Sequence, residues 1–321
     1  MKLISKLCGL STSLVVWFVQ TIVEQFGYHL IKGGYFSPIT NIRELRLTKD
    51  IWAKRSQMRG IDIDLDKQVD RLRVTCQKYS SEYSGNKIYK YAAKHGLGLG
   101  FGYIEAQVLH SVIRHHKPAN IVEVGGGIST YCMLHALEKN QQDTSDECSL
   151  TCIEPFPSKG LLALEKVNVI NTTVQAVEDF SLIDRLSRND ILFIDSSHSV
   201  KPGSDVNFLI LEVLPRLNSG VIVHFHDIYL PYDYTRKVLE SYHRHWMETA
   251  LLHAYLIDNS RLNILYCMSL LHYDRQEYLR QLFPDYKPQL DSDGLRDKKY
   301  AGQEHSSGNH FPGSIYLQVA D

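Results

Sequence analysis

Residues 121–130 read Ile-Val-Glu-Val-Gly-Gly-Gly-Ile-Ser-Thr. The β-branched run predicts a strand, the three glycines predict a tight turn, and the Ser-Thr pair with the apolar residues after it predicts the start of a helix. Glycines let a ligand lie against bare backbone, and free N–H groups at the start of a helix favour an anionic or polar group. We therefore expect a nucleotide-type cradle at the glycine turn, with the free N–H groups at the start of the following helix beside the ligand.

The spacing of the glycines separates two kinds of nucleotide. A dinucleotide fingerprint would have its third glycine at position 130, where this chain has threonine. The pattern E-x-G-x-G, formed by Glu123, Gly125 and Gly127, resembles instead the first motif of class I S-adenosylmethionine-dependent methyltransferases. A glycine-rich turn alone fits a purely structural strand-to-helix turn equally well, so the neighbouring residues must decide.

Length, charge and cysteine spacing exclude several classes of protein. The chain has 321 residues, with 35 Lys and Arg and 36 Asp and Glu, so its net charge of -1 leaves no basic footprint for nucleic acid. The length suits one large domain with additions, or two small ones. Its 6 cysteines include no C-x-x-C pair. They predict neither a zinc site nor a disulfide framework, and they fit a reducing, cytoplasmic location.

The N-terminal segment, residues 1–34, is expected to form an apolar helix. Residues 7–23 carry no charged side chain, and Lys2 and Lys6 precede them. A membrane-spanning helix needs about 20 predominantly apolar residues, and this run is shorter and contains Ser, Thr and Gln. Three interpretations stay open: a helix packed on the domain or in a homo-oligomer interface, a helix in contact with a membrane surface through residues 1–31, and a span or secretory signal.

The rest of the chain is expected to form a helical cap, residues 35–95, and a ligand-binding domain, residues 96–321. The glycine-rich segment 94–102 predicts a hinge or a substrate-side loop. After the glycine turn, strand-like and helix-like runs alternate, which predicts a doubly wound α/β fold with a mostly parallel sheet. Further strands are expected at 149–153, within 167–177, from 190, from 220, at 262–268 and at 314–319, the last antiparallel at the sheet edge.

Acidic residues follow the second and third of the expected strands. Glu154 comes directly after the second strand, where a carboxylate can accept hydrogen bonds from a ribose diol because ligands gather at the carboxyl ends of parallel strands. The alternative is an ordinary surface glutamate. Glu178 follows the third strand; either it lies near the adenine, as family resemblance implies, or it is a favourable charge at the start of a helix.

Titratable residues cluster where the fourth and fifth strands end. Asp195 and His198 follow the fourth strand, and the fifth ends in His226 and Asp227. Asp195, His226 and Asp227 are candidate ligands for a divalent cation, Mg²⁺ or another. His198, with Asp195 in support or in contact with the substrate, is the candidate catalytic base that takes a hydroxyl proton. Alternatively, His224 and His226 satisfy buried hydrogen bonds.

The segments EVGGGIST, IEP, FIDSSH and HDIYLP together resemble bacterial class I methyltransferases grouped with macrolide-sugar O-methyltransferases and cephalosporin-hydroxylase-like proteins. The resemblance runs from about residue 35 to residue 317. It implies a Rossmann-like, seven-stranded fold, S-adenosylmethionine as cofactor, and methyl transfer to a hydroxyl of a sugar, glycan or glycosylated natural product. The cofactor-binding residues it implies are Glu123, Gly125, Gly126, Gly127, Ser129, Thr130, Glu154 and Glu178.

One departure from the family pattern leaves alternatives open. Metal-dependent relatives carry two acidic residues after the fifth strand, whereas this chain carries His226 and Asp227. A metal-dependent enzyme of another reaction type, or a non-catalytic cofactor-binding partner protein, would therefore also fit the motifs. The aromatic run 229–234 is expected to border the acceptor pocket or to pack against a helix, and residues 288–312 to form a mobile polar loop.

Overall fold

The computed structural model describes residues 14–98, 100–145, 147–233, 245–289 and 310–321. The chain forms two compact units, Met1–Lys49 and Asp50–Asp321. In the first unit a helix covers residues 14–24 and α2 covers Ile42–Leu47, where Asn41 caps it by accepting the N–H groups of Arg43 and Glu44. Within the described ranges, no helix is long and apolar enough to cross a membrane. The domain boundaries expected at residues 34 and 95 stay predictions.

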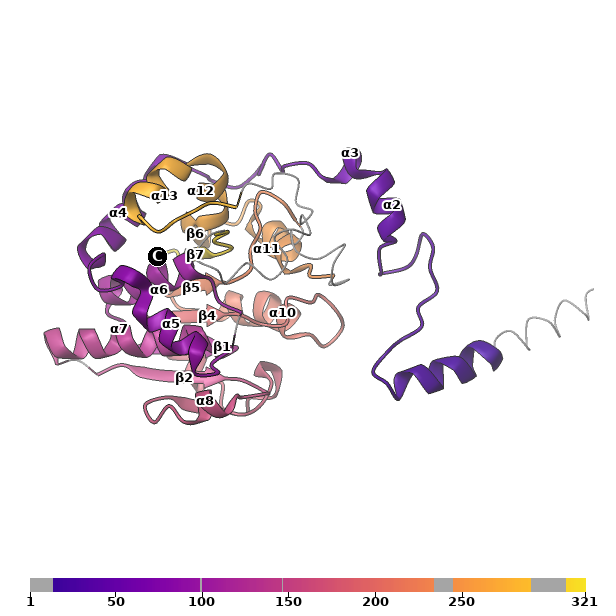
Figure 1. Ribbon diagram of the computed structural model, residues 1–321, viewed down its shortest axis with the longest axis horizontal. Coiled ribbons are helices and arrows are strands. Elements are labelled where there is room, and N and C mark those ends of the chain that lie inside the picture. The colour runs from indigo at the N-terminus through magenta and orange to yellow at the C-terminus, as the bar shows by residue number, and fades with distance from the viewer. Residues whose placement is uncertain (1–13, 99, 146, 234–244, 290–309) are drawn as a thin grey trace, which may run out of the picture. The chain divides into compact units, whose positions relative to one another are not determined.

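The second unit is built on a seven-stranded sheet with the order β3-β2-β1-β4-β5-β7-β6. The strands are β1 (Asn120–Val124), β2 (Ser149–Ile153), β3 (Asn168–Ile170), β4 (Ile191–Ile194), β5 (Ile222–Phe225), β6 (Leu262–Cys267) and β7 (Ile315–Val319). The first five are parallel, and β7 is antiparallel to both β5 and β6. From β6 to β2 the strand labels follow this order down the sheet in Figure 1. The predicted Rossmann-like, doubly wound, mostly parallel fold is confirmed.

The last strand departs from the expected position. We expected residues 314–319 at the sheet edge, but β7 lies between β5 and β6, and β6 takes the edge. The reason is that β7 is apolar on both of its faces: Ile315 and Leu317 are buried on one side and Tyr316 on the other. A strand that is buried on both faces is more stable inside a sheet than at its edge.

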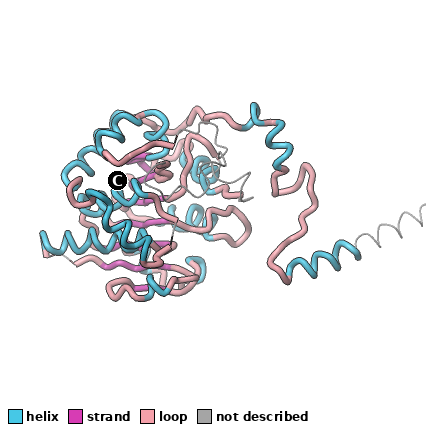
Figure 2. Tube along the Cα trace, in the orientation of Figure 1, coloured by secondary structure: helices cyan, strands magenta, loops and turns pink. Residues whose placement is uncertain are grey.

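Helices cover both faces of the sheet, and Figure 2 shows the strands grouped between them. One face carries α4 (Leu65–Cys76), α5 (Lys87–Lys94), α6 (Tyr103–His116) and α7 (Ile128–Thr144); the other carries α10 (Asp205–Phe208) and α11 (Glu248–Leu256). Shorter helices are α3 (Lys49–Trp52), α8 (Lys159–Leu162), α9 (Ser181–Asp184), α12 (Met268–Asp274) and α13 (Gln276–Leu282). Successive residues of each strand face opposite cores, as Phe193 and Ile194 do.

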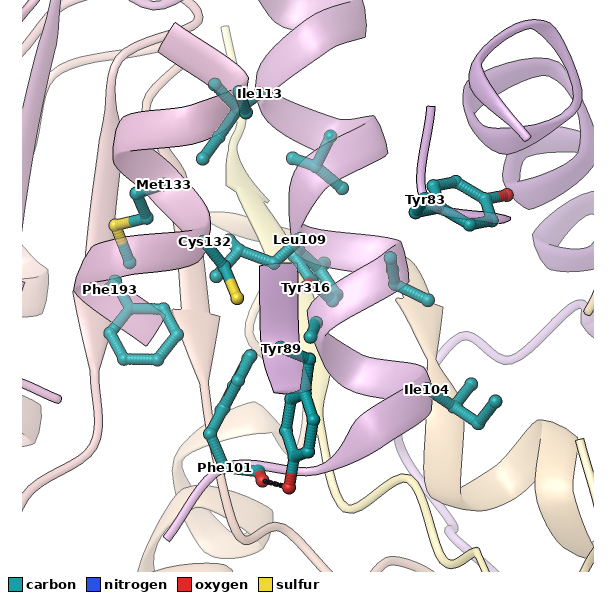
Figure 3. Packing of buried hydrophobic residues seen from close by; sticks show 14 of the residues in the cluster. Tyr83, Tyr89, Phe101, Ile104, Leu109, Ile113, Cys132, Met133, Phe193 and Tyr316 are labelled. Atoms are coloured by element: carbon teal, nitrogen blue, oxygen red, sulfur yellow. Dashed lines mark hydrogen bonds between the residues drawn. The ribbon is translucent and has the colours of Figure 1, made fainter. Parts of the chain in front are cut away.

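The glycine-rich segment 94–102, predicted to be a hinge or a loop, contributes buried side chains to the core beneath α4, α5, α6 and α7. Figure 3 shows Phe101 near Tyr89 and Phe193, with the Tyr89 hydroxyl donating a hydrogen bond to the Phe101 carbonyl at 3.0 Å. Leu97 is buried in the same core. The described part of the segment therefore lies against the sheet near the glycine turn.

Candidate functional site

The glycine turn after β1 is shaped by close contacts with its neighbours. A Cβ atom on Gly125, whose φ is +86°, would lie 1.9 Å from the carbonyl oxygen of Asp195. A Cβ on Gly126 would lie 2.4 Å from Cys152 Sγ. A Cβ on Gly127 would lie 2.7 Å from the carbonyl oxygen of Leu97. Each distance is far below van der Waals contact, so these positions exclude any side chain.

The N–H groups of the glycine turn itself are bonded within the protein, whereas the free N–H groups expected at the start of the following helix stay a prediction. The Gly125 N–H donates to the Ile153 carbonyl at 3.0 Å, and the Gly126 N–H donates to Glu154 Oε2 at 3.1 Å. The Gly127 N–H donates to Thr130 Oγ1 at 2.9 Å. The end of β2 and the first turn of α7 thus satisfy these donors from within the protein, as buried backbone groups require.

Glu123 braces the turn from inside the domain. Its side chain is fully buried and accepts hydrogen bonds from Ser129 Oγ and Thr130 Oγ1, both at 2.6 Å. Burial raises the pKa of Glu123 to about 7, although the two hydroxyls oppose this shift. The structure therefore brings these three predicted residues together beneath the turn, and their contact with a cofactor stays a prediction.

Glu154 lies beside the turn, and the described residues use only half of its capacity to accept hydrogen bonds. Besides the Gly126 N–H, it accepts the Phe156 N–H at 2.7 Å through its other oxygen. A carboxylate offers about four acceptor positions, so two stay open on the half-buried Glu154. Glu178 lies apart, exposed, in a bend between β3 and α9.

His198 occupies the centre of the second group of predicted residues. Its ring is buried, and Nε2 lies 3.3 Å from Asp195 Oδ1 and 3.6 Å from Asp227 Oδ2. His198 and Asp227 both have positive φ, 56° and 55°, which is uncommon for residues other than glycine. Such conformations persist where the surrounding structure imposes them, and they are frequent at functional sites.

Sequence reasoning missed Glu248, which holds His198 from the other side. Glu248 Oε2 lies 2.6 Å from His198 Nδ1, and the His198 carbonyl accepts the N–H groups of Met247 at 3.0 Å and Glu248 at 3.3 Å. The side chain of Glu248 is only 1% exposed. A signal was present in the sequence, because Glu248 is the one carboxylate in the apolar run 246–257.

A second missed carboxylate, Glu105 of α6, pairs with His226. The Nε2 atom of His226 lies 3.3 Å from Glu105 Oε2, and Nδ1 lies 3.2 Å from Asp195 Oδ1. Asp227, the next residue along the chain, accepts a hydrogen bond from the Tyr229 hydroxyl at 2.8 Å. The two histidines and their carboxylates form one connected network at the carboxyl ends of β4 and β5.

This network fixes the charge of both histidines. Burial alone would lower their pKa, but hydrogen bonds to Asp195 and Glu248 raise the pKa of His198 to about 10. The charges of Glu105 and Asp195 raise the pKa of His226 well above its usual range. In return, despite its burial, the two imidazoles hold the pKa of Asp195 well below its usual range. Near neutral pH the site therefore contains two imidazolium ions.

The predicted metal ligands are neighbours, but they are paired with one another. Among the residues that the structure describes, no group of three or more His, Cys, Asp or Glu side chains could hold a metal ion. His226 directs both ring nitrogens at carboxylates, so in this arrangement neither nitrogen is open to a metal. Asp195, His226 and Asp227 as arranged here do not fit a divalent cation, so we derive no step through one.

Aromatic residues that follow β5 are packed into the protein interior next to the histidine network. Tyr229 and Tyr232 of the aromatic run are buried, with Tyr229 stacked on Phe311 at 5.7 Å between ring centroids. Tyr234 and most of the expected polar loop lie outside the described residues. His224 makes no hydrogen bond within the described part of the chain, so that half of the buried-histidine alternative is wrong; its ring stacks on Tyr316 instead.

Comparison with known proteins finds a family match over the stretch that contains this site. Residues 122–228 match the family model described as Methyltransferase domain. This stretch is a third of the chain, and it contains every site residue predicted from the sequence. A protein of Archaeoglobus fulgidus of uncharacterized function is 28% identical over 191 residues, which cover 56% of this chain and 83% of the relative. The family match supports a methyltransferase.

Solved structures also show similarity, at low sequence identity. A candidate O-methyltransferase from Klebsiella pneumoniae has a TM-score of 0.43 and 13% identity, covering 77% of this chain and 96% of its own. The SAH-bound methyltransferase PaMTH1 of Podospora anserina has a TM-score of 0.41 and 11% identity, covering 90% of this chain and 100% of its own. Because these TM-scores are below 0.5, the fold assignment rests on the strand order itself.

Proposed function

We propose that this protein transfers the methyl group of S-adenosylmethionine to a hydroxyl of a sugar, glycan or glycosylated natural product. The observation that carries the proposal is the placement of Glu154, the glycine turn and His198 beyond the carboxyl ends of three adjacent strands, β2, β1 and β4. That edge is where open α/β sheets bind their ligands. The match of residues 122–228 to a methyltransferase domain supports the same reaction class.

Glu154 is the residue we assign to the donor's ribose. Its two open acceptor positions match a vicinal diol, while its bonds to Gly126 and Phe156 hold the carboxylate in place. The turn at residues 125–127 offers backbone without side chains, so a ligand can approach it closely. Glu123 acts indirectly in this assignment, by keeping Ser129 and Thr130 in the positions that define the turn.

His198 is the proposed base. When bound, the donor supplies an electrophilic methyl group on a sulfonium cation. The positive charge of that cation lowers the pKa of a nearby imidazolium, so His198 loses its proton more readily in the complex than in the free protein. Nε2 then takes the proton of the acceptor hydroxyl as its oxygen bonds to the methyl carbon and the carbon–sulfur bond breaks. Asp195 and Asp227, within 3.6 Å of Nε2, orient the acceptor.

Methyl transfer from labelled S-adenosylmethionine to a panel of sugars, glycans and glycosylated natural products tests the proposal. We expect His198→Gln to lower turnover at least about a hundredfold while donor binding is kept, because general-base catalysis is worth that much. The exposed His115 provides a matched control, His115→Gln, which should keep full activity.

Two results would contradict the proposal. Donor binding with no transfer to any acceptor would favour a non-catalytic cofactor-binding protein. Full activity of His198→Gln would remove the base. A chelator tests the remaining alternative, a metal-dependent enzyme. We expect turnover to be unchanged by the chelator. A loss of turnover that added Mg²⁺ reverses would indicate that Asp195, His226 and Asp227 rearrange around a cation.

A further inference from the structure

The described part of the first unit, residues 14–49, exposes its apolar side chains instead of burying them. In the helix over residues 14–24, Trp17 is 66% exposed and Phe18 is 60% exposed, and Leu14, Val15 and Val16 are exposed as well. No residue between 14 and 49 is buried. Five consecutive apolar residues occupy every side of the helix over residues 14–18, and a stretch of helix that is apolar all round is stable in an apolar environment.

The apolar residues continue beyond this helix as exposed aromatic side chains. Tyr28, Tyr35 and Phe36 are all largely exposed, with Phe36 at 95%. Aromatic residues of this kind are enriched where one part of a side chain contacts lipid and another contacts water. Within the described part of the chain, no helix is long and apolar enough to cross a bilayer, whose core is about 30 Å thick. The segment suits the membrane surface.

Charge is divided unevenly between the two units. Residues 1–49 contain 6 Lys and Arg against 2 carboxylates, whereas residues 50–321 contain 29 Lys and Arg against 34 carboxylates. Three of the basic residues, Arg43, Arg46 and Lys49, lie within or directly beside α2. The apolar segment is thus followed by a cationic one, the combination that binds anionic lipid.

We propose that residues 14–49 bind the surface of a membrane that contains anionic lipid. The apolar side chains of residues 14–36 enter the headgroup region, and the basic residues around α2 pair with lipid phosphates. A second copy of the chain is a poorer occupant, because two such segments would bring like charges together. This proposal is independent of the proposed methyl transfer.

Flotation of the full chain with lipid vesicles tests it. We expect the protein to float with vesicles of equimolar phosphatidylcholine and phosphatidylglycerol, and at least about tenfold less with phosphatidylcholine alone. Trp17→Glu combined with Phe18→Glu should abolish flotation, and Arg43→Gln with Arg46→Gln should weaken it. The control is Val74→Glu in α4, since Val74 is exposed to a similar degree, 61%, outside the segment. The folded state of each variant is checked by circular dichroism.

Either of two results would overturn the proposal. One is failure of the native protein to float with either vesicle. The other is flotation that Trp17→Glu with Phe18→Glu leaves unchanged. If the native protein does not float but forms a dimer in analytical ultracentrifugation that the same double variant dissociates, the apolar segment is covered by a second copy instead.

Discussion

At the scale of single residues, the charge of His198 is set by carboxylates from three different elements. Asp195 follows β4, Asp227 follows β5, and Glu248 lies in α11. Of these, Glu248 makes the shortest contact, 2.6 Å to Nδ1, and leaves Nε2 directed at the other two. Glu248 is therefore a positioning residue that also stabilises the protonated ring.

The sign of the resulting pH dependence follows from the raised pKa of His198. A base must be deprotonated, and the free protein holds His198 with a pKa of about 10, so kcat/KM should rise with pH through the neutral and alkaline range. Glu248→Gln removes one stabilising charge and should move this limb at least about one pH unit lower. A purely structural role would lower kcat/KM equally at every pH. The exposed Glu212 supplies the control, Glu212→Gln.

At the scale of elements, the positions of the strands along the sequence were predictable. The contacts between segments that are distant in the sequence were not. The runs that become β1, β2, β4 and β5 are short, apolar and bounded by turn residues, so their positions follow from local sequence. The placement of β7 between β5 and β6, and the arrival of Glu105 and Glu248 at the histidines, depend on packing between distant segments. Local periodicity carries no information on such contacts.

Helix α6 carries a buried contact that should make stability depend on pH. His110 Nε2 lies 2.7 Å from Glu82 Oε2, and Arg114 Nε donates to the same oxygen at 2.8 Å. Burial lowers the pKa of His110 to about 4, although Glu82 opposes the shift. In the unfolded chain the pKa is about 6.5, so the unfolded chain binds more protons between these values. The free energy of unfolding should therefore fall as the pH drops through that window.

Denaturant unfolding at about pH 7 and about pH 5 measures this effect, which should amount to about 2 kcal/mol. His110→Gln should reduce the dependence by about that amount, because glutamine does not titrate, whereas His116 and His310, whose pKa burial also lowers to about 4, keep titrating. His95→Gln, at an exposed position, should leave it unchanged. An equally steep loss of stability in His110→Gln would assign the effect to other groups.

At the scale of the whole molecule, the second unit places two groups of predicted residues on one edge of its sheet. Glu154 and the glycine turn lie at β2 and β1, and His198 lies beyond β4. Strand order alone makes them neighbours, which is why the sequence predicted the site as a set. A cavity of about 460 Å³ is lined by residues at the starts of α4 and β6, away from this edge. It takes no part in the proposed reaction.

Calorimetric titration of the full chain with S-adenosylmethionine and S-adenosylhomocysteine tests the central claim most directly. We expect micromolar binding of both, weakened at least about tenfold by Glu154→Ala and unchanged by Glu165→Ala, a nearby exposed control. A folded protein that binds neither compound would contradict the account, and the turn at residues 125–127 would then be a structural connection between β1 and α7.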